Sequence, residues 1–424
     1  MTIKQANPRR VARERRRKRE ERRQLRDLEK NKVTEAVHKV LKVVTFEDLD
    51  GDQLIAYKGI HEWWDTSQEC GGVPKPLVIG GYAGTGKSTL LSIALPALKN
   101  SDSSDVRVAY CAYTGKAANG LINKGLNAST VHKLIYNVDD EQEYGEDTKF
   151  ILKEPFEIDA ELIVVDEASM VPDGMRKDME SLGIPILYTG DHGQLPPVAG
   201  AGNVMTTPHL RLETIHRQAE DSGIIKIATM VRQGKKVANG KYGVNLDAEK
   251  IPVTFKDDIE LLSKADVVVC YTNASRQKYN KLIRKHKGFK GKVPQVGEKL
   301  ICVKNNKCTQ MFNGLSVTIT AITEEKDVYI IDCIDEAGNQ RNRINVANNY
   351  FQGYDHPVIR GQTVIDIFEF AYAITGHKSQ GSQWDHVIVI EEPMFRQKSE
   401  YKRKWLYTVL TRAINKITWI SRFH

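Results

Sequence analysis

The stretch "VIGGYAGTGKSTLL" (residues 78–91) constrains the fold more than any other part of the sequence. It joins an apolar run to a helix-like run through Gly81-x-x-x-x-Gly86-Lys87-Ser88. Glycines in such a loop let backbone N–H groups approach a phosphate, and the dipole of the following helix strengthens the attraction. The lysine reaches the outer phosphates and the serine hydroxyl can ligate Mg²⁺. The loop therefore predicts nucleotide binding, which kinases, transporters, switches and motors share.

Short apolar runs alternate with helix-like segments in two parts of the chain. The first part contains "PLVIGGYAG", "VRVAYCAY", "ELIVVDEAS" and "IPILYTGD", and the second contains "ADVVVCYTN", "DHVIVIEE" and "KITWISRF". Such alternation is typical of parallel α/β sheets. We therefore expect an α/β fold with two lobes, at residues 36–205 and 206–424. An amphipathic helix, "TFEDLDGDQLIAYKGIHEWW", precedes the first sheet.

Two insertions interrupt this pattern. Residues 136–159 are polar and acidic and indicate a small insertion in the first lobe. Residues 290–362 contain "GEKLICVKNN", "LSVTITAITEE", "VYIIDCID" and "RNRINVANN", which are short alternating runs separated by turns. Alternation of this kind favours a small β-barrel inserted in the second lobe.

The positive charge of the chain is concentrated at its N-terminus. The net charge is +8, but residues 1–32 alone contain 14 Lys or Arg and 5 Asp or Glu, so the remainder is about −1. We expect residues 1–35 to form a basic tail, either a solvated segment or an arm that binds a polyphosphate such as nucleic acid. Six cysteines without a metal-ligand spacing, a charged N-terminus and the lack of a long apolar run indicate a cytoplasmic protein with reduced thiols.

Two further motifs predict hydrolysis of the nucleotide. "LIVVDEAS" ends an apolar run in Asp166 and Glu167, so one acid can hold the metal's water shell and the other can polarise an attacking water. "LYTGDHGQLPPV" places Gln194 in a loop after a strand, where it can contact both the γ-phosphate and that water. A structural turn would explain the two prolines but not the whole string. These motifs indicate an NTPase.

The complete series of motifs resembles that of the superfamily 1 helicases. Gln53, the phosphate-binding loop and seven later strings occur in the order of that family, from about residue 45 to residue 424. The later strings are "YTGKAANGL", "STVHKLI", "VVDEAS", "GDHGQLPPV", "IHRQ", "AITGHKSQGSQWD" and "YTVLTRA". The chain looks like the 5′-to-3′ branch, the RecD-like and Dda-like DNA helicases. The resemblance implies two RecA-like lobes, an SH3-like barrel in the second lobe, and ATP and Mg²⁺ as cofactors.

The resemblance also implies roles for individual residues in ATP hydrolysis. Glu167 is the expected base, Gln194 the γ-phosphate sensor, and Arg217 and Arg412 the arginines that reach the γ-phosphate from the second lobe. Two arginines across a cleft would couple lobe closure to ATP. The catalytic set is Lys87, Glu167, Gln194, Arg217 and Arg412. The metal ligands are Ser88 and Asp166, and the nucleotide-binding set is Gln53, Gly81, Gly84, Thr85, Gly86, Lys87, Ser88, Thr89 and Gly381.

Other strings resemble the contacts of this family with a nucleic-acid strand. Hydroxyl and lysine side chains suit backbone phosphates without reading bases. We expect Gln380 and Gly381 at the junction of nucleotide and strand. Phe150 and Tyr144 are candidate wedge residues of a strand-separating pin, or parts of a solvated hairpin; Lys304, Lys307 and Phe312 belong to a strand clamp or to an exposed turn. The expected strand contacts are Thr114, Lys116, Thr130, His132, Thr375, His377 and Lys378.

The resemblance predicts an ATP-dependent DNA helicase that moves 5′ to 3′ on single-stranded DNA and unwinds duplex. Its expected partners are single-stranded and tailed duplex DNA, with a single-strand-binding, replication or recombination protein at the basic tail, in a bacterium or a phage-infected cell. The alternatives are an RNA helicase, a translocase that does not unwind, and a nucleotide-gated interaction protein. Glu167 and Gln194 argue against the last, because a switch needs no complete hydrolytic set.

Overall fold

The computed structural model describes residues 45–138 except Gly71, 150–196, 203–216 and 221–421, with short gaps at 305, 307–308, 310, 312, 326–327, 336–337, 348–350, 352–364 and 395. The chain divides into two units, residues 1–50 and 51–424. In the first unit a 3₁₀ helix, η1 (Phe46–Asp48), is capped by the Asp48 carboxylate, which accepts the Thr45 N–H at 2.9 Å. The predicted basic tail lies outside the described residues.

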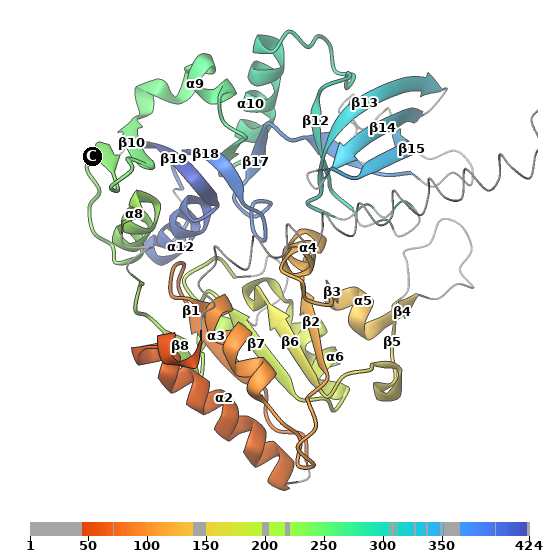
Figure 1. The fold of residues 1–424 in the computed structure, drawn as a ribbon. Helices are drawn as coiled ribbons and strands as arrows, with labels where there is room; N and C mark the ends of the chain where they lie inside the picture. The colour runs from red at the N-terminus through yellow and green to blue at the C-terminus, as the bar shows by residue number, and fades with distance from the viewer. Residues whose placement is uncertain are drawn as a thin grey trace, which may run out of the picture. The chain divides into compact units, whose positions relative to one another are not determined.

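The first lobe of the second unit contains a six-stranded, fully parallel sheet (Figure 1). Its central strands are buried along their length, which is why they appear in the sequence as uninterrupted apolar runs. The last strand, β8, lies beyond residue 205, so the sheet extends past the expected end of this lobe. In spatial order the strands are β3 (Ala128–Thr130), β2 (Val108–Ala112), β6 (Leu162–Asp166), β7 (Ile186–Gly190), β1 (Leu77–Gly81) and β8 (Leu210–Leu212).

Helix α2 (Gly51–Cys70) is the amphipathic helix that the sequence predicts before the first sheet. Ala56, Ile60 and Trp64 recur at helical spacing and are buried, and the Trp64 indole N–H donates to the Lys99 carbonyl at 2.8 Å. The helix contacts α3, β1 and β8. The other helices of this lobe are α3 (Lys87–Ala94), α4 (Gly115–Asn123), α5 (Val131–Ile135) and α6 (Asp173–Ser181), with 3₁₀ turns η2 (Leu95–Ala97), η3 (Pro155–Glu157), η4 (Ala168–Met170) and η5 (Val204–Thr206).

The second lobe also contains a six-stranded sheet, parallel except for its last strand. In spatial order the strands are β17 (Ala373–Thr375), β11 (Val267–Cys270), β18 (Trp384–Ile390), β19 (Ala413–Ser421), β10 (Ala248–Pro252) and β9 (Gly240–Tyr242). The helices of this lobe are α8 (Gly223–Arg232), η6 (Val253–Asp257), α9 (Ile259–Ser263), α10 (Asn273–His286) and α12 (Ser399–Leu410).

A five-stranded antiparallel sheet is inserted between α10 and β17 (Figure 1). The alternation of the sequence predicted four of these strands, because one face of the sheet packs on its own core and the other does not, whereas β16 lies beyond the expected range of 290–362. An isolated bridge joins Val346 to Asp366. The strands, in spatial order, are β15 (Gln340–Ala347), β14 (Val328–Asp335), β13 (Ser316–Glu325), β12 (Lys299–Cys302) and β16 (Phe368–Phe370).

Two short strands lie within the expected insertion of the first lobe. Strands β4 (Tyr136–Val138) and β5 (Phe150–Leu152) pair antiparallel. Phe150 is 46% exposed, and its ring contacts His132, with 5.5 Å between ring centroids. Tyr144 lies outside the described residues. Four cysteines, Cys111, Cys270, Cys302 and Cys333, are buried free thiols.

Candidate active site and nucleic-acid interface

The phosphate-binding loop connects β1 to α3, as the sequence predicts. Gly86 is the residue before α3 and has a φ of 71°, in the left-handed region that favours glycine. A Cβ at this position would lie 2.2 Å from Gln53 Nε2. The Lys87 ammonium donates to the carbonyls of Gly81 at 2.7 Å and Tyr82 at 3.1 Å, so its side chain folds back over the loop. The other nucleotide-binding residues expected here are Gly84, Thr85, Ser88 and Thr89.

Gln53 comes from the first turn of α2 and is buried. Its amide donates to the Gly86 carbonyl at 3.2 Å. The structure therefore brings Gln53 to the phosphate-binding loop, 33 residues further along the chain.

The two acids lie where β6 ends, in the same sheet as β1, with β7 between the two strands. Asp166 is the last residue of β6, and Glu167 follows with a φ of 51°. Such a backbone is costly for a residue other than glycine and is found most often at functional sites. Burial raises the pKa of the Glu167 carboxyl, while Arg412 and Lys87 favour its charged form. Glu167 Oε2 is buried and has no hydrogen-bond partner within the described part of the chain.

Gln194 lies in the loop that follows β7, and Asp191 organises that loop. Asp191 Oδ1 accepts the Gly193 N–H at 2.8 Å, and Oδ2 accepts the Gln194 amide at 3.4 Å. Gln194 is buried, and its Oε1 has no partner among the residues that the structure describes. The amide nitrogen is thus held while the amide oxygen stays available as an acceptor.

Arg412 reaches this site from the second lobe, directly after α12. It is 3% exposed; its Nε donates to the Thr408 carbonyl at 2.9 Å and its Nη2 to Thr411 Oγ1 at 3.2 Å. Its charge is close enough to favour ionisation of Glu167. Arg217, the other expected arginine, lies outside the described residues.

These residues fit a nucleoside triphosphate with Mg²⁺. Two buried acceptors, Glu167 Oε2 and Gln194 Oε1, lack partners in the described structure, and buried polar atoms in native proteins are normally paired. The Glu167 carboxylate also lies near the cationic groups of Lys87 and Arg412. Ser88 and Asp166 supply the hard oxygen donors that Mg²⁺ prefers.

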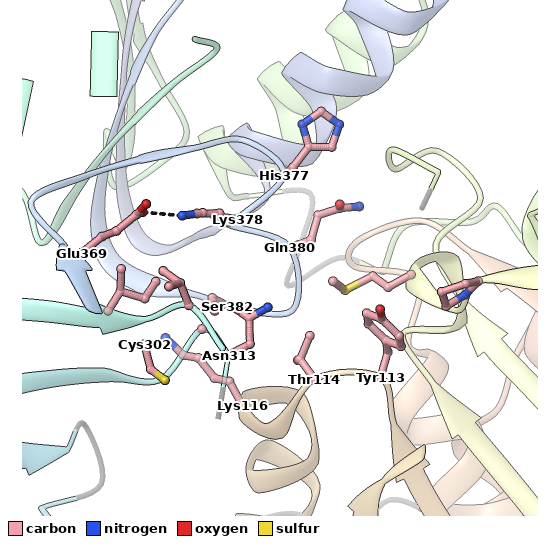
Figure 2. A pocket seen from close by; sticks show the side chains of 15 residues that line it. Tyr113, Thr114, Lys116, Cys302, Asn313, Glu369, His377, Lys378, Gln380 and Ser382 are labelled. Carbon is pink, nitrogen blue, oxygen red and sulfur yellow. Dashed lines mark hydrogen bonds and ion pairs between the residues drawn. The ribbon is translucent and has the colours of Figure 1, made fainter. Parts of the chain in front are cut away.

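A cavity of about 510 Å³ lies between the two lobes and the inserted sheet (Figure 2). Thr114 and Lys116 enter it from the start of α4, and His377, Lys378 and Gln380 from the loop after β17. Of the seven expected strand contacts, four therefore share one cavity. The inserted sheet and its loops contribute Ile301, Cys302, Val303, Asn313, Gly314 and Glu369.

The other three expected strand contacts do not line this cavity. Thr130 caps α5, its hydroxyl accepting the Lys133 N–H at 3.2 Å. The His132 ring lies 6.0 Å, between centroids, from that of Tyr113, which does line the cavity. Thr375 ends β17, and its carbonyl accepts the Ser379 N–H at 3.1 Å.

Glu369 is a cavity residue that the motifs did not predict. Its carboxylate contacts both the Lys378 ammonium (Figure 2) and the Arg276 guanidinium. Burial lowers the pKa of Lys378, and the negative charge of Glu369 opposes that shift. Glu369 lies in β16, which pairs with β12 of the inserted sheet, and no motif of the sequence includes it.

Gln380 connects the cavity to the loop of Gln194. Its Nε2 donates to the carbonyl of Leu195 at 3.0 Å, and both residues are buried. The next residue, Gly381, has a φ of 70°, and a Cβ there would lie 2.7 Å from Thr114 Oγ1. The two residues thus lie where the lobes meet.

Fold and site together define a P-loop nucleotide-binding protein with two parallel-sheet lobes. Two family models match the sequence: an AAA domain at residues 74–245 and a UvrD-like helicase C-terminal domain at residues 370–418. The first covers most of the first lobe, and the second covers the loop of His377 and Lys378 together with α12.

Curated relatives include two helicases. The chain is 26% identical over 366 residues to the ATP-dependent RecD2 DNA helicase of Deinococcus radiodurans, covering 80% of this chain and 46% of the relative. It is 28% identical over 231 residues to the ATP-dependent DNA helicase dda of Enterobacteria phage T4, covering 49% and 52%. The chain spans about half the length of each of these relatives.

Solved Pif1 helicase structures share the fold. One, which concerns DNA unwinding at forked duplex DNA by two coordinating Pif1 helicases, has a TM-score of 0.53 at 19% identity and covers 89% of this chain and 93% of that one. Pif1 from Bacteroides in complex with ADP-AlF3 and single-stranded DNA has a TM-score of 0.51 at 18% identity, covering 87% and 92%. The resemblance to superfamily 1 helicases of the 5′-to-3′ branch is confirmed.

In the part of the chain that the structure describes, no helix is both long and apolar enough to cross a membrane.

Proposed function

We propose that this protein is an ATP-dependent DNA helicase that translocates 5′ to 3′ on single-stranded DNA and unwinds duplex. The observation that carries the proposal is the hydrogen bond of 3.0 Å between Gln380 Nε2 and the Leu195 carbonyl. Gln380 lines the strand cavity, and Leu195 directly follows the candidate γ-phosphate sensor Gln194. A change at the nucleotide therefore has a direct route to the cavity, which is what a motor requires.

The residues of the nucleotide site supply the parts of a hydrolytic mechanism. Glu167 accepts a proton from the attacking water, and the free Oε1 of Gln194 accepts a hydrogen bond from the same water. Arg412 stabilises the negative charge that develops on the phosphate oxygens, and we assign the same role to Arg217. Lys87 and the backbone of residues 81–86 hold the phosphates. Ser88 and Asp166 would hold Mg²⁺, which neutralises phosphate charge when bound.

The cavity suits the backbone of a single strand. Lys116, His377 and Lys378 offer cationic or donor groups, and Thr114 offers a hydroxyl, none of which discriminates between bases. We place Thr130, His132 and Thr375 along the continuation of the strand. DNA as the substrate, and the direction of movement, are inferred from the likeness to DNA helicases of the 5′-to-3′ branch.

The accessory elements have proposed roles in unwinding. We propose that the inserted sheet closes as an SH3-like barrel that clamps the strand, and that Phe150 of the β4–β5 hairpin is the wedge of the pin. We also propose a division into a tail (residues 1–35), a RecA-like lobe ending after β8, and a second RecA-like lobe that carries the insertion. A DNA motor of this kind would act in the cytoplasm, with a replication or recombination protein as a partner of the tail.

Strand displacement tests the proposal. Duplexes tailed at the 5′ or the 3′ end would be incubated with ATP and Mg²⁺, and ATPase would be measured in parallel with DNA or RNA strands. We expect displacement only from the 5′ tail and stimulation by DNA. Stimulated ATPase without displacement would indicate a translocase, stimulation by RNA alone an RNA helicase, and no stimulation by either a nucleotide-gated protein. The Lys87→Ala variant should be inactive in every assay.

A further inference from the structure

Tyr407 of α12 bridges the second lobe to two loops of the nucleotide site. The side chain is 2% exposed. Its hydroxyl accepts the N–H of Ala83 at 2.9 Å and donates to Asp191 Oδ2 at 2.6 Å. Ala83 lies in the phosphate-binding loop, and Asp191 is the residue that organises the Gln194 loop. One hydroxyl of the second lobe thus joins two loops of the first.

The Tyr407 hydroxyl is suited to act as a hydrogen-bond donor to Asp191. Burial, followed by the charge of Asp191, raises the pKa of Tyr407 far above its usual value, so the hydroxyl stays protonated and donates to the carboxylate. A neutral donor on an ionised acceptor makes a short, strong hydrogen bond. The bond between Tyr407 and Asp191 therefore forms whenever α12 is in place.

The aromatic ring of Tyr407 is held as firmly as its hydroxyl. It packs edge-on against Tyr82, the residue before Ala83, with 6.2 Å between ring centroids and an interplanar angle of 82°. The Arg232 guanidinium of α8 lies 3.4 Å from the centroid of the Tyr82 ring. Two helices of the second lobe thus contact the same residue of the phosphate-binding loop.

Asp191 connects Tyr407 to Gln194 through hydrogen bonds. Its Oδ2 accepts both the Tyr407 hydroxyl and the Gln194 amide, at 2.6 Å and 3.4 Å. This contact holds the amide nitrogen of Gln194, while its buried Oε1 has no partner among the described residues. The neighbouring residue of α12 supports the same loop, since the Thr408 hydroxyl accepts the Leu195 N–H at 2.9 Å. Arg412 follows one turn later on the same chain segment.

We infer that Tyr407 is a positioning residue for ATP hydrolysis: its hydroxyl fixes the phosphate-binding loop and, through Asp191, orients the amide of Gln194. The position of α12 against the first lobe then controls both Arg412 and the sensor. This inference rests on the proposed hydrolytic function, because it concerns the rate of that reaction.

The test compares Tyr407→Phe with Tyr242→Phe as a matched control. Tyr242 also belongs to the second lobe, and its hydroxyl donates to the Ala238 carbonyl at 2.6 Å, away from the nucleotide site. We expect Tyr407→Phe to lower the kcat of ATP hydrolysis about tenfold while KM for ATP changes less than about twofold, as loss of one charge-assisted hydrogen bond implies. Tyr242→Phe should leave both unchanged.

Asp191→Asn, alone and combined with Tyr407→Phe, tests whether Tyr407 acts on Gln194 through Asp191. If Tyr407 orients Gln194 through Asp191, the losses in kcat should be less than additive in the double variant, because both changes break the same Tyr407–Asp191 hydrogen bond. Additive losses, or a kcat for Tyr407→Phe within about twofold of wild type, would overturn the inference. Melting temperature is measured for each variant; if Tyr407→Phe does not fold, an unchanged kcat in Asp191→Asn overturns it equally. ATPase is also measured without DNA. The role of Tyr407 in hydrolysis can then be judged even if the wild-type protein does not unwind DNA.

Discussion

The ammonium group of Lys378 contacts the carboxylate of Glu369, and the same carboxylate contacts the guanidinium of Arg276. Lys378 is an expected contact of the nucleic-acid strand, whereas Glu369 is an acid of the inserted sheet that shares its cavity. A strand phosphate must therefore compete with a carboxylate for Lys378. If the cavity binds a strand as proposed, we expect this pair to limit how tightly the cavity holds each phosphate.

Replacing Glu369 with Gln should strengthen binding of single-stranded DNA. The change removes the competing charge, so we expect an affinity about three- to tenfold higher and a log–log salt slope steeper by about one phosphate contact. Fluorescence anisotropy with an oligothymidine, measured over a salt series, tests this. Asp257→Asn is the control, because it removes one acid from an exposed pair with Lys278 in the same lobe. Weaker binding by Glu369→Gln would mean that Glu369 orients Lys378 for the strand.

Replacing Glu167 with Gln should abolish turnover and spare ATP binding. The amide cannot accept the proton of the attacking water, so we expect kcat to fall about 10²- to 10⁴-fold. Steady-state ATPase and equilibrium binding of a fluorescent ATP analogue measure the two effects. Glu180→Gln is the control, since Glu180 pairs with Arg176 on the surface of the same lobe. Turnover equal to that of wild type would remove Glu167 from its role as the base.

The junction between α10 and the inserted sheet depends on a buried ion pair. Arg284 donates to both carboxylate oxygens of Glu298, at 2.6 Å and 2.8 Å, and Glu298 is fully buried. Arg284→Met would leave that carboxylate without its cation, so we expect the free energy of unfolding to fall by about 3–5 kcal/mol. Arg284→Met combined with Glu298→Gln should recover part of the loss. Urea unfolding followed by tryptophan fluorescence measures both; equal stability of Arg284→Met and wild type would contradict the prediction.

Removing residues 1–32 tests the basic tail. If the tail binds DNA, the truncated protein should bind single strands more weakly and with a flatter dependence of log K on log salt, because fewer counterions are released. The ATPase at saturating DNA should not change. An unchanged salt slope would assign the tail, with its local balance of +9, to a protein partner.

The sequence predicted most elements of both lobes because each has a local signal. The strands β1, β6 and β7 are buried, so each begins with a run of apolar residues, and a motif follows at or directly after the end of each. The inserted strands alternate because they have one core face. Short β8 gave no such signal: it is three residues long and joins the first sheet only through β1. The first sheet consequently includes residues beyond 205.

Part of the candidate site could be predicted from motifs, and part could be seen only in the structure. Motif order selected Gln53, Lys87, Glu167, Gln194 and Arg412 as candidates, and the structure places them on the phosphate-binding loop and the segments around it. It separates the expected strand contacts into four that line the cavity and three that do not. Asp191 belongs to the motif "GDHGQLPPV", but no role was predicted for it. Its partners are a backbone N–H, a side-chain amide and a distant hydroxyl, which the motif alone does not reveal.

By itself, the sequence determined the class of fold and predicted that the chain binds and hydrolyses a nucleotide. Glycine spacing, apolar runs and motif order are properties of neighbouring residues. Only the tertiary structure decided which groups act on one another. Tyr407 and Asp191 are 216 residues apart, and Glu369 contacts Lys378 from a strand of the inserted sheet. Hydrogen bonds and ion pairs depend on distances of about 3 Å, and those distances are set only when the lobes pack.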